Sequence, residues 1–305
     1  MAPKGDRADV SLPGVWPGLL LRVAGRCVHA IVIEADGGGP DGGGAGPPIL
    51  LLHGLGGLAQ EVLAPLEPLA ARHRLVALDR PGYGHTEALP ARSMAPHRQA
   101  RWLAAAMDRL GLHRPVLLAH SLGAATALCL ALDRPERVAG LVLVAPFVRP
   151  TRPAAAPLLR LAVAPVVGLP LRTHVLPRLA GLLAGPRLAQ AFAPDPVPPA
   201  FRDFPAALAA QPSAVQAMAD ELRGFNDSMI PRALRLRRCR VPVVVVAGGR
   251  DRVAPADRHA RWLVRRMPRA RLVLLRRAGH MPHHTHPDAV MRAVETVAKA
   301  ARRRG

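Results

Sequence analysis

The 305-residue sequence predicts an α/β protein in which helices cover both faces of a mostly parallel, doubly wound sheet. Short runs that are apolar throughout alternate with segments of helical length. Apolar strands of this kind are typical of a parallel sheet that is buried on both faces. Half of the residues are apolar, which is enough to bury the core of one large domain, or of a domain with an insertion.

The predicted strands are rich in leucine and β-branched residues. They are Ile49–Leu52, Leu75–Leu78, Val116–Ala119, Leu141–Val144, Val243–Val246 and Leu272–Leu275. The segments of helical length are Leu58–Arg72, Met94–Leu110 and Leu122–Leu132. We expect a hairpin around Leu20–Glu34 to add antiparallel strands at the sheet edge, and the Gly37–Gly46 run to be a flexible loop.

The alternation of strands and helices stops between about Phe147 and Arg240. This stretch is rich in proline, contains no run typical of a strand, and carries helical fragments at Leu176–Leu183 and Pro205–Gln211. We therefore expect residues 1–146 and 240–305 to form the core, and residues 147–239 to form a helical cap, or lid, over the sheet.

The charge of +21 raises the question of nucleic-acid binding. Lysine occurs only at Lys4 and Lys299, so 42 − 2 = 40 of the basic residues are arginine, which also suits a coding bias. Aromatic residues are 3% of the chain, whereas proteins that bind single-stranded nucleic acid stack bases on aromatic side chains. We expect no nucleic-acid partner. A basic surface that attracts acidic substrates or an anionic membrane stays open.

Three widely spaced cysteines, Cys27, Cys129 and Cys239, indicate neither a disulfide framework nor a zinc ribbon. We therefore expect a cytoplasmic protein. Arg22 interrupts the first short apolar run, so no signal peptide is predicted. The longest uncharged apolar stretch of the middle third, Leu161–Leu171, is far shorter than the roughly 18 residues of a membrane span. Peripheral membrane contact stays open.

A serine, Ser121, lies between a predicted strand and a predicted helix, in the segment Ala119-His-Ser-Leu-Gly123. Such a turn is tight and strained, and small neighbours two positions away permit it. The turn exposes the hydroxyl and frees the next backbone N–H to bind an oxyanion. Alanine replaces the first glycine of the pattern G-x-S-x-G, but it is still small. Ser121 is therefore the predicted nucleophile; the alternative is a serine that caps an ordinary helix.

The chain here resembles the α/β-hydrolase fold family over nearly its whole length. Besides the serine segment, the motifs are His53-Gly-Leu-Gly-Gly57, Asp79-Arg-Pro-Gly-Tyr-Gly84, Ala247-Gly-Gly-Arg-Asp251 and Arg277-Ala-Gly-His280. The resemblance implies that Asp251 is the supporting acid, that His280 is the general base, and that the N–H groups of Leu55 and Leu122 form the oxyanion hole. Serine, aspartate and histidine also follow one another in the order of this fold.

The chemistry explains these residue types. Serine is a poor nucleophile until a base takes its proton, and imidazole titrates near working pH. A carboxylate orients the imidazole and stabilises its protonated form. We expect a serine hydrolase of carboxylic esters or thioesters, without metal or organic cofactor, that acts on a small-molecule acyl substrate. A C–C bond hydrolase, a perhydrolase with the same residues, and a non-catalytic binding or accessory protein stay as alternatives.

Two further patterns have competing interpretations. Gly54-Leu-Gly-Gly-Leu-Ala59, followed by Asp79, also matches a dinucleotide-binding fingerprint. That interpretation leaves Ser121, Asp251 and His280 unexplained. Four histidines within seven residues could bind a metal; they are His280, His283, His284 and His286. Adjacent ligands on one loop rarely form a site, and only Asp288 accompanies them nearby, so we expect no functional metal.

The predicted lid has an unusual charge pattern. No Asp or Glu occurs between Arg137 and Pro194, but arginines are spread among apolar residues. They are Arg149, Arg152, Arg160, Arg172, Arg178 and Arg187. Such a surface suits an acidic or lipid-like substrate, such as a fatty acyl thioester, or docking on anionic lipid. The alternative is a solvated lid with arginines that only reflect coding bias.

Overall fold

A computed structural model describes residues 7–10, 16–36, 46–151, 159, 161–164, 166–201 and 204–303. The predicted loop at Gly37–Gly46 lies outside these ranges except for its last residue, and Arg152 and Arg160 also lie outside them.

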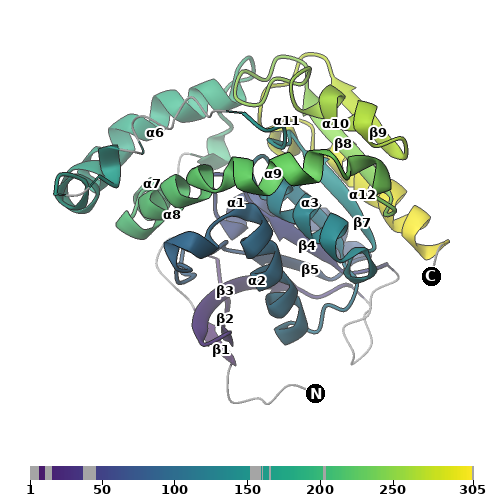
Figure 1. Ribbon diagram of the computed structural model, residues 1–305, viewed down its shortest axis with the longest axis horizontal. Coiled ribbons are helices and arrows are strands. Elements are labelled where there is room, and N and C mark those ends of the chain that lie inside the picture. The colour runs from purple at the N-terminus through teal and green to yellow at the C-terminus, as the bar shows by residue number, and fades with distance from the viewer. Residues whose placement is uncertain are drawn as a thin grey trace.

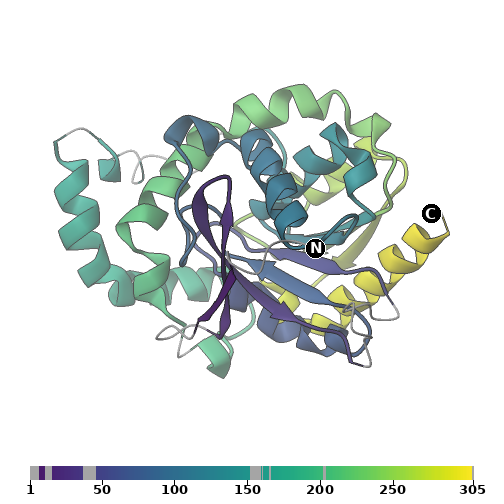
Figure 2. The ribbon, with the colours of Figure 1, turned by 90° about the horizontal axis from the view of Figure 1, so that it is seen from below.

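The described residues form one nine-stranded sheet in the order β1-β2-β3-β5-β4-β6-β7-β8-β9 (Figures 1 and 2). The strands are β1 (Arg7–Val10), β2 (Gly18–Val23), β3 (Arg26–Ile33), β4 (Ile49–Leu52), β5 (Leu75–Leu78), β6 (Val116–His120), β7 (Gly140–Val144), β8 (Val243–Gly248) and β9 (Ala270–Leu275). Only the pairs β1/β2, β2/β3 and β3/β5 are antiparallel within these ranges. The predicted fold class is confirmed, and so is the N-terminal hairpin, to which β1 adds a third strand.

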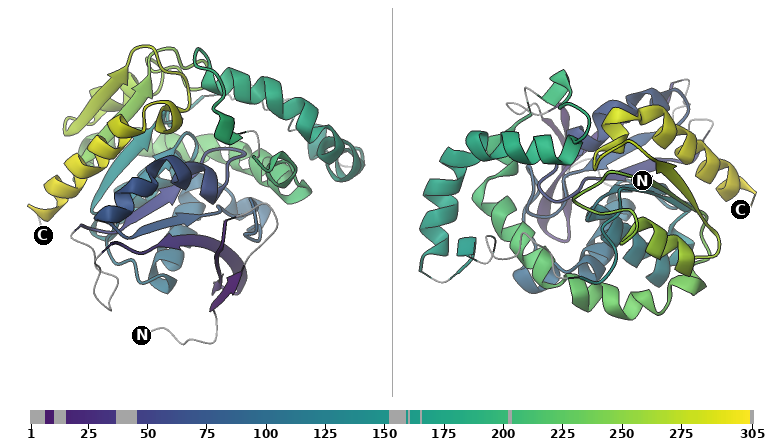
Figure 3. Two further views of the ribbon diagram at one scale, coloured as in Figure 1. Left: turned by 180° about the vertical axis from the view of Figure 1, so that it is seen from behind. Right: turned by 90° about the horizontal axis from the view of Figure 1, so that it is seen from above.

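Alternate residues of the parallel strands supply two separate cores. Leu50 and Leu52 of β4 pack with α2 (Pro96–Arg109), α3 (Gly123–Asp133) and α10 (Ala260–Arg266) on one face. The residues between them face α1 (Ala59–Leu63), the 3-10 helix η2 (Ala64–Ala71) and α12 (Pro287–Arg302) on the other (Figure 3, left). Strands β4 to β8 are buried on both faces, which is why they are apolar almost throughout, whereas β9 at the edge is only partly buried.

The predicted helix Leu58–Arg72 is the clearest local difference. The α-helical part ends at Leu63, and η2 continues to Ala71 with a tighter turn. Pro65 and Pro68 have no N–H and cannot donate the i→i−4 hydrogen bonds of an α-helix, which explains the change of helix type.

Between β7 and β8 the described residues contain helices and no strand. These are α5 (Gly168–Pro170), a π-helical turn η5 (Leu171–Val175), α6 (Leu176–Phe192), the 3-10 helix η6 (Pro199–Phe201), α7 (Ala206–Ala209), α8 (Pro212–Arg223), α9 (Phe225–Ala233) and the 3-10 helix η7 (Leu236–Arg238). Two short 3-10 helices of the core complete the set: η3 (Ala91–Ser93) and η4 (Pro135–Arg137), with α11 (Pro282–Thr285) before α12. In Figure 1 the helices α6, α8 and α9 lie above β1, β2 and β3, and β8 and β9 are drawn higher than α8 and α9. The division into a core and a cap of residues 147–239 stays a prediction.

Candidate active site

Ser121 lies in a strained turn at the end of β6, directly before α3. Its φ is +50°, in the left-handed region that non-glycine residues rarely adopt. Two backbone hydrogen bonds of 2.9 Å hold it: the Ser121 N–H donates to the carbonyl of Val144, and its carbonyl accepts from the N–H of Phe147. The end of the neighbouring strand β7 therefore supports the strained backbone.

The two small residues next to the Ser121 turn, Ala119 and Gly123, differ in whether their positions accept a side chain. A Cβ at Gly123 would lie 2.5 Å from the backbone oxygen of His53, so a larger residue there needs the backbone to move. Ala119 is completely buried inside β6 and fits as alanine. The second small position of the serine motif is thus sterically required, while the first accepts a methyl group.

Ser121, His280 and Asp251 form one hydrogen-bonded chain, although they lie far apart in the sequence. Nε2 of His280 is 2.9 Å from Oγ of Ser121, and its Nδ1 is 2.7 Å from Oδ2 of Asp251. All three residues are buried, with exposures of 5–6%. The structure thus brings together the three side chains that the sequence predicted.

The hydrogen-bond directions in this chain follow from the charge of Asp251. Burial raises the pKa of its carboxyl, but the electrostatic attraction and hydrogen bond from His280, with the backbone hydrogen bonds from Ala254 and Val253, outweigh burial and lower that pKa below its usual value. The other oxygen, Oδ1, accepts from the N–H groups of Val253 and Ala254 at 2.8 Å. An ionised carboxylate only accepts, so Nδ1 of His280 carries the hydrogen and Nε2 can accept the Ser121 proton.

The loop His53–Gly57 packs against the serine. A Cβ at Gly54 would lie 3.0 Å from Cβ of Ser121. Among the described residues, no acceptor is bonded to the backbone N–H of Leu55 or of Leu122. The assignment of these two N–H groups to an oxyanion hole stays a prediction.

Hydrogen bonds to the Gly54 carbonyl hold the peptide unit between Gly54 and Leu55 in place. The Gly54 carbonyl accepts from Nδ1 of His53 at 2.8 Å and from the Arg80 guanidinium at 3.1 Å. The Arg80 N–H donates to Nε2 of His53 at 2.9 Å, so Nδ1 of His53 is the protonated nitrogen. Because the Gly54 carbonyl and the Leu55 N–H belong to one planar unit, these bonds also set the direction of the Leu55 N–H.

A buried ion pair connects this loop to helix α8. The Arg80 guanidinium donates to both carboxylate oxygens of Glu221 on α8, and the Tyr83 hydroxyl donates to Glu221 at 2.9 Å. Arg80 and Glu221 are 1% and 0% exposed. Sequence reasoning missed Glu221, because it lies 141 residues from Arg80 and in no motif.

The predicted histidine cluster is divided in the structure. His280 bonds to Asp251, and His286 bonds to Thr285, whereas His283 and His284 both donate from Nε2 to Oε1 of Glu61, at 2.7 and 3.1 Å. Burial raises the pKa of Glu61, but these hydrogen bonds outweigh it and hold that pKa well below its usual value. Glu61 belongs to α1, so no local sequence signal joined it to these histidines.

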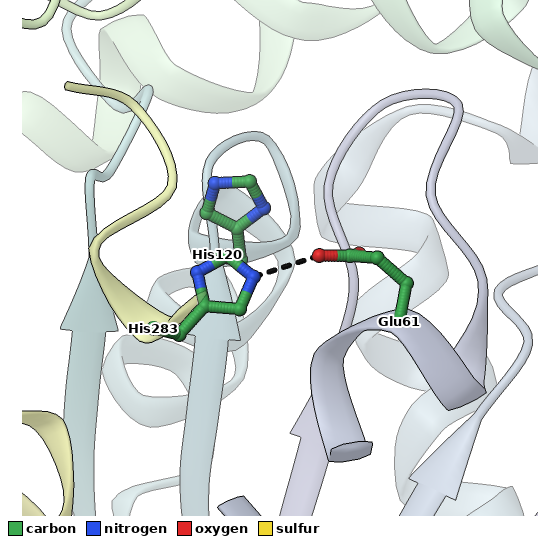
Figure 4. A group of neighbouring side chains, drawn as sticks. All are labelled: Glu61, His120 and His283. Atoms are coloured by element: carbon green, nitrogen blue, oxygen red, sulfur yellow. Dashed lines mark hydrogen bonds and ion pairs between the residues drawn. The ribbon is translucent and has the colours of Figure 1, made fainter. Parts of the chain in front are cut away.

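Three buried side chains in this region could hold a metal ion (Figure 4). One potential ligand atom from each of Glu61, His120 and His283 lies within 4.8 Å of the others. His120 donates from Nε2 to the carbonyl of His280 at 3.0 Å, and its Nδ1 has no partner among the described residues. Oε1 of Glu61 already accepts hydrogen bonds from two histidine side chains, so this oxygen has protein partners without an ion.

Asp79 has a structural role in the alternative dinucleotide motif. Its carboxylate, 2% exposed, accepts from the N–H groups of Ala59 and His85 at 2.8 and 3.1 Å, and lies 2.8 Å from Nδ1 of His29. A dinucleotide site needs this carboxylate to face a ribose. Here it is bonded inside the protein, and it anchors the start of α1 behind the His53–Gly57 loop.

Comparison with known proteins agrees with this architecture. A dihydrolipoyllysine-residue acetyltransferase component of an acetoin cleaving system, from Cupriavidus necator, is 37% identical over 105 residues, which are 34% of this chain and only 28% of that protein. A 2-hydroxy-6-oxononadienedioate/2-hydroxy-6-oxononatrienedioate hydrolase from Pseudomonas putida is 28% identical over 270 residues, covering 81% of this chain and 85% of that protein.

A solved structure, the enol-lactonase from Burkholderia xenovorans LB400, superimposes with a TM-score of 0.71 at 21% identity and covers 92% of this chain and 99% of that one. The family model described as alpha/beta hydrolase fold matches residues 47–287, from the strand before the His53–Gly57 loop to the start of α12. The chain therefore belongs to the α/β-hydrolase fold family.

Proposed function

We propose that this protein is a serine hydrolase that cleaves carboxylic ester or thioester bonds of a small acyl substrate. The hydrogen-bonded chain from Asp251 through His280 to Ser121 carries the proposal. It places a base on a serine hydroxyl, and a carboxylate on the far side of that base. This is the arrangement that activates a serine nucleophile.

In the proposed mechanism, Nε2 of His280 takes the Oγ proton as Ser121 attacks the carbonyl carbon. The tetrahedral intermediate collapses when the bond to the leaving alcohol or thiol breaks, and His280 gives its proton to that group. Water then attacks the acyl-enzyme in the same way and releases the acid. Asp251 stays ionised throughout and stabilises the imidazolium of His280.

The N–H groups of Leu55 and Leu122 are the proposed donors to the oxyanion. Donors that are already oriented need no reorganisation when negative charge develops on the carbonyl oxygen. The bonds from His53 and Arg80 to the Gly54 carbonyl give the Leu55 N–H that orientation. Arg80 also adds positive charge behind the peptide unit, which Glu221 balances.

A fluorophosphonate probe tests the proposal directly. The purified protein should be labelled on Ser121, and Ser121→Ala should not be labelled. The exposed Ser213, changed to alanine, is the matched control and should label like the unmodified protein. A panel of p-nitrophenyl esters and acyl thioesters then reports the preferred acyl length. Absence of both labelling and turnover in folded protein would contradict the proposal.

A second candidate is hydrolysis of a carbon–carbon bond. The relative named as a 2-hydroxy-6-oxononadienedioate/2-hydroxy-6-oxononatrienedioate hydrolase favours it, because the similarity covers 81% of this chain. Assays with that compound and with esters under the same conditions separate the candidates. Faster turnover of the dienedioate than of every ester would select the second.

A further inference from the structure

We propose that the segment from Leu161 to Arg187 carries a membrane-docking face that binds peripherally to anionic phospholipid. We define the docking face by Leu169, Val175, Leu179 and Leu182, with Arg172, Arg178 and Arg187 around them. This inference does not depend on the proposed hydrolase activity, because it rests on the surface of the lid and not on Ser121.

Exposed apolar side chains are concentrated in this segment. Ten large apolar residues are exposed in the described part of the chain, and seven of them lie between residues 161 and 182. They are Leu161, Val166, Val167, Leu169, Val175, Leu179 and Leu182. Isolated exposed leucines are ordinary, but a contiguous group of them marks an interaction surface.

Helix α6 and the residue before it present part of this group as a stripe. Val175 ends η5 directly before α6, and Leu179 and Leu182 lie in α6. Their spacings of four and three residues place them on one side of the helix. Leu182 is 74% exposed. Within α6 the only polar residues are Arg178, Arg187 and Gln190, so the solvent side lacks the polar surface of an ordinary amphipathic helix.

The C-terminal end of α6 is packed on the protein, in contrast to the rest of the helix. Phe192 is completely buried against Phe201 and Met281, and the Ala191 carbonyl accepts from the N–H of His280 at 2.9 Å. The helix extends from this anchor away from the sheet (Figures 1 and 3). The stripe is therefore held on a fixed helix and faces outward.

The charges decide which partner fits. In the described ranges, no carboxylate pairs with Arg172, Arg178 or Arg187; Arg172 and Arg178 each donate to one backbone carbonyl. Long cationic side chains can rest their stems on apolar surface while their heads reach phosphate groups. A second copy docking through the same face would bring like charges together. Anionic lipid offers both an apolar layer and the opposite charge.

The described helices are too short or too polar to cross a bilayer, so the contact is at the surface. The test is co-sedimentation with vesicles of phosphatidylcholine alone, and with an equal mixture of phosphatidylcholine and phosphatidylglycerol. We expect binding to the mixed vesicles that weakens as salt rises, and little binding to the neutral ones. Changing Arg172, Arg178 and Arg187 together to glutamine should weaken binding on the order of 100-fold, roughly fivefold for each charge.

Matched variants separate the docking face from general surface properties. Leu179→Asp with Leu182→Asp should abolish vesicle binding, whereas Leu234→Asp, at an exposed leucine outside the face, should not. Glutamine at Arg237, Arg238 and Arg265 removes as much charge elsewhere and should have a much smaller effect. Circular dichroism checks that each variant folds.

Three results would overturn the proposal. One is equal loss of binding from both arginine sets, which would indicate only general charge. Another is no binding to mixed vesicles at low salt. The third is a dimer in sedimentation velocity that Leu179→Asp with Leu182→Asp converts to monomer, because a second copy would then be the occupant. Loss of ester hydrolysis alone would bear on the proposed function and not on docking.

Discussion

The carboxyl edge of the sheet and the docking face differ in where their side chains find partners. At the sheet edge, Asp251, Asp79 and Glu61 are buried, and each accepts hydrogen bonds from several neighbours. On α6, leucines face outward, and arginines have no carboxylate partner in the described ranges. A buried charge needs a partner inside the protein. An exposed apolar stripe can be buried only by contact with another molecule. Substitutions at the sheet edge should therefore destabilise the fold, whereas substitutions on the docking face should leave the stability of the free protein nearly unchanged.

The largest effect should come from Ser121→Ala. Without the nucleophile, kcat for ester hydrolysis should fall by about 10⁶-fold, while the free energy of unfolding changes little, since the hydroxyl makes one hydrogen bond. Steady-state kinetics and denaturant unfolding measure the two quantities. Near-normal turnover in this variant would remove Ser121 from the mechanism.

Asp251→Asn should lower kcat by about 10⁴-fold with little change in KM. An asparagine amide can donate to Nδ1 of His280, which moves the imidazole hydrogen to Nε2 and leaves no lone pair facing Ser121. Glutamine at the half-buried His286, which is not part of the chain from Asp251 to Ser121, is the control and should leave kcat unchanged. A large rise in KM at constant kcat would instead indicate that Asp251 binds substrate.

Glu221→Gln should destabilise the protein by about 3–5 kcal/mol, because it leaves the Arg80 charge buried and without its partner. Urea unfolding measures this change. The matched control is Asp257→Asn, which breaks the exposed pair with Arg261 and should have no measurable effect. Equal effects of the two variants would show that burial does not distinguish these ion pairs.

Acid should destabilise the protein well above the pKa of its carboxyl groups. Burial is the main cause that lowers the pKa of His53, His259 and His283 from 6.5 to about 4. Between these values only the unfolded chain binds the protons, so stability falls as pH falls. Each histidine contributes about 1 kcal/mol per pH unit, or about 3 kcal/mol together between roughly pH 6.5 and 5.5.

Unfolding in guanidinium chloride at several pH values measures this slope. His259→Gln should reduce it by about a third, because one of the three groups no longer titrates. Changing the exposed His113 to glutamine should leave it unchanged. The carboxyl groups with lowered pKa, such as Glu61, act at lower pH, where their stabilisation is lost as pH falls. A flat profile above pH 5 would contradict the assignment of neutral buried histidines.

The smallest effect on the fold should come from the docking face. Leu179→Asp with Leu182→Asp should change the free energy of unfolding by no more than about 0.5 kcal/mol, as ordinary surface substitutions do. Leu51→Ala in the buried β4 should cost about 2–5 kcal/mol. If the α6 variant costs as much as the core variant, the stripe packs on the protein itself, and the contrast between the regions fails.

Local sequence patterns were sufficient for the parallel strands, the fold class and the strand-to-helix turn at Ser121, but β1 was not predicted. Apolar strands of a buried parallel sheet leave a signal within four residues, and the small residues around Ser121 lie within two positions of it. The change of helix type after Leu63 was not predicted, although its cause, Pro65 and Pro68, is local in the sequence. Asp251 and His280 were predicted from the resemblance of the motifs Ala247–Asp251 and Arg277–His280 to the α/β-hydrolase family.

Only the tertiary structure decided the pairings that complete the site. Glu61 meets His283 across 222 residues, and Arg80 meets Glu221 across 141. Neither pair can be recognised from the sequence near one partner. A buried charge needs an opposite charge, but any distant residue can supply it. The same holds for the arginines of α6: the sequence by itself determined that no acidic residue lies near them along the chain. Folding decided that the leucines between them face outward.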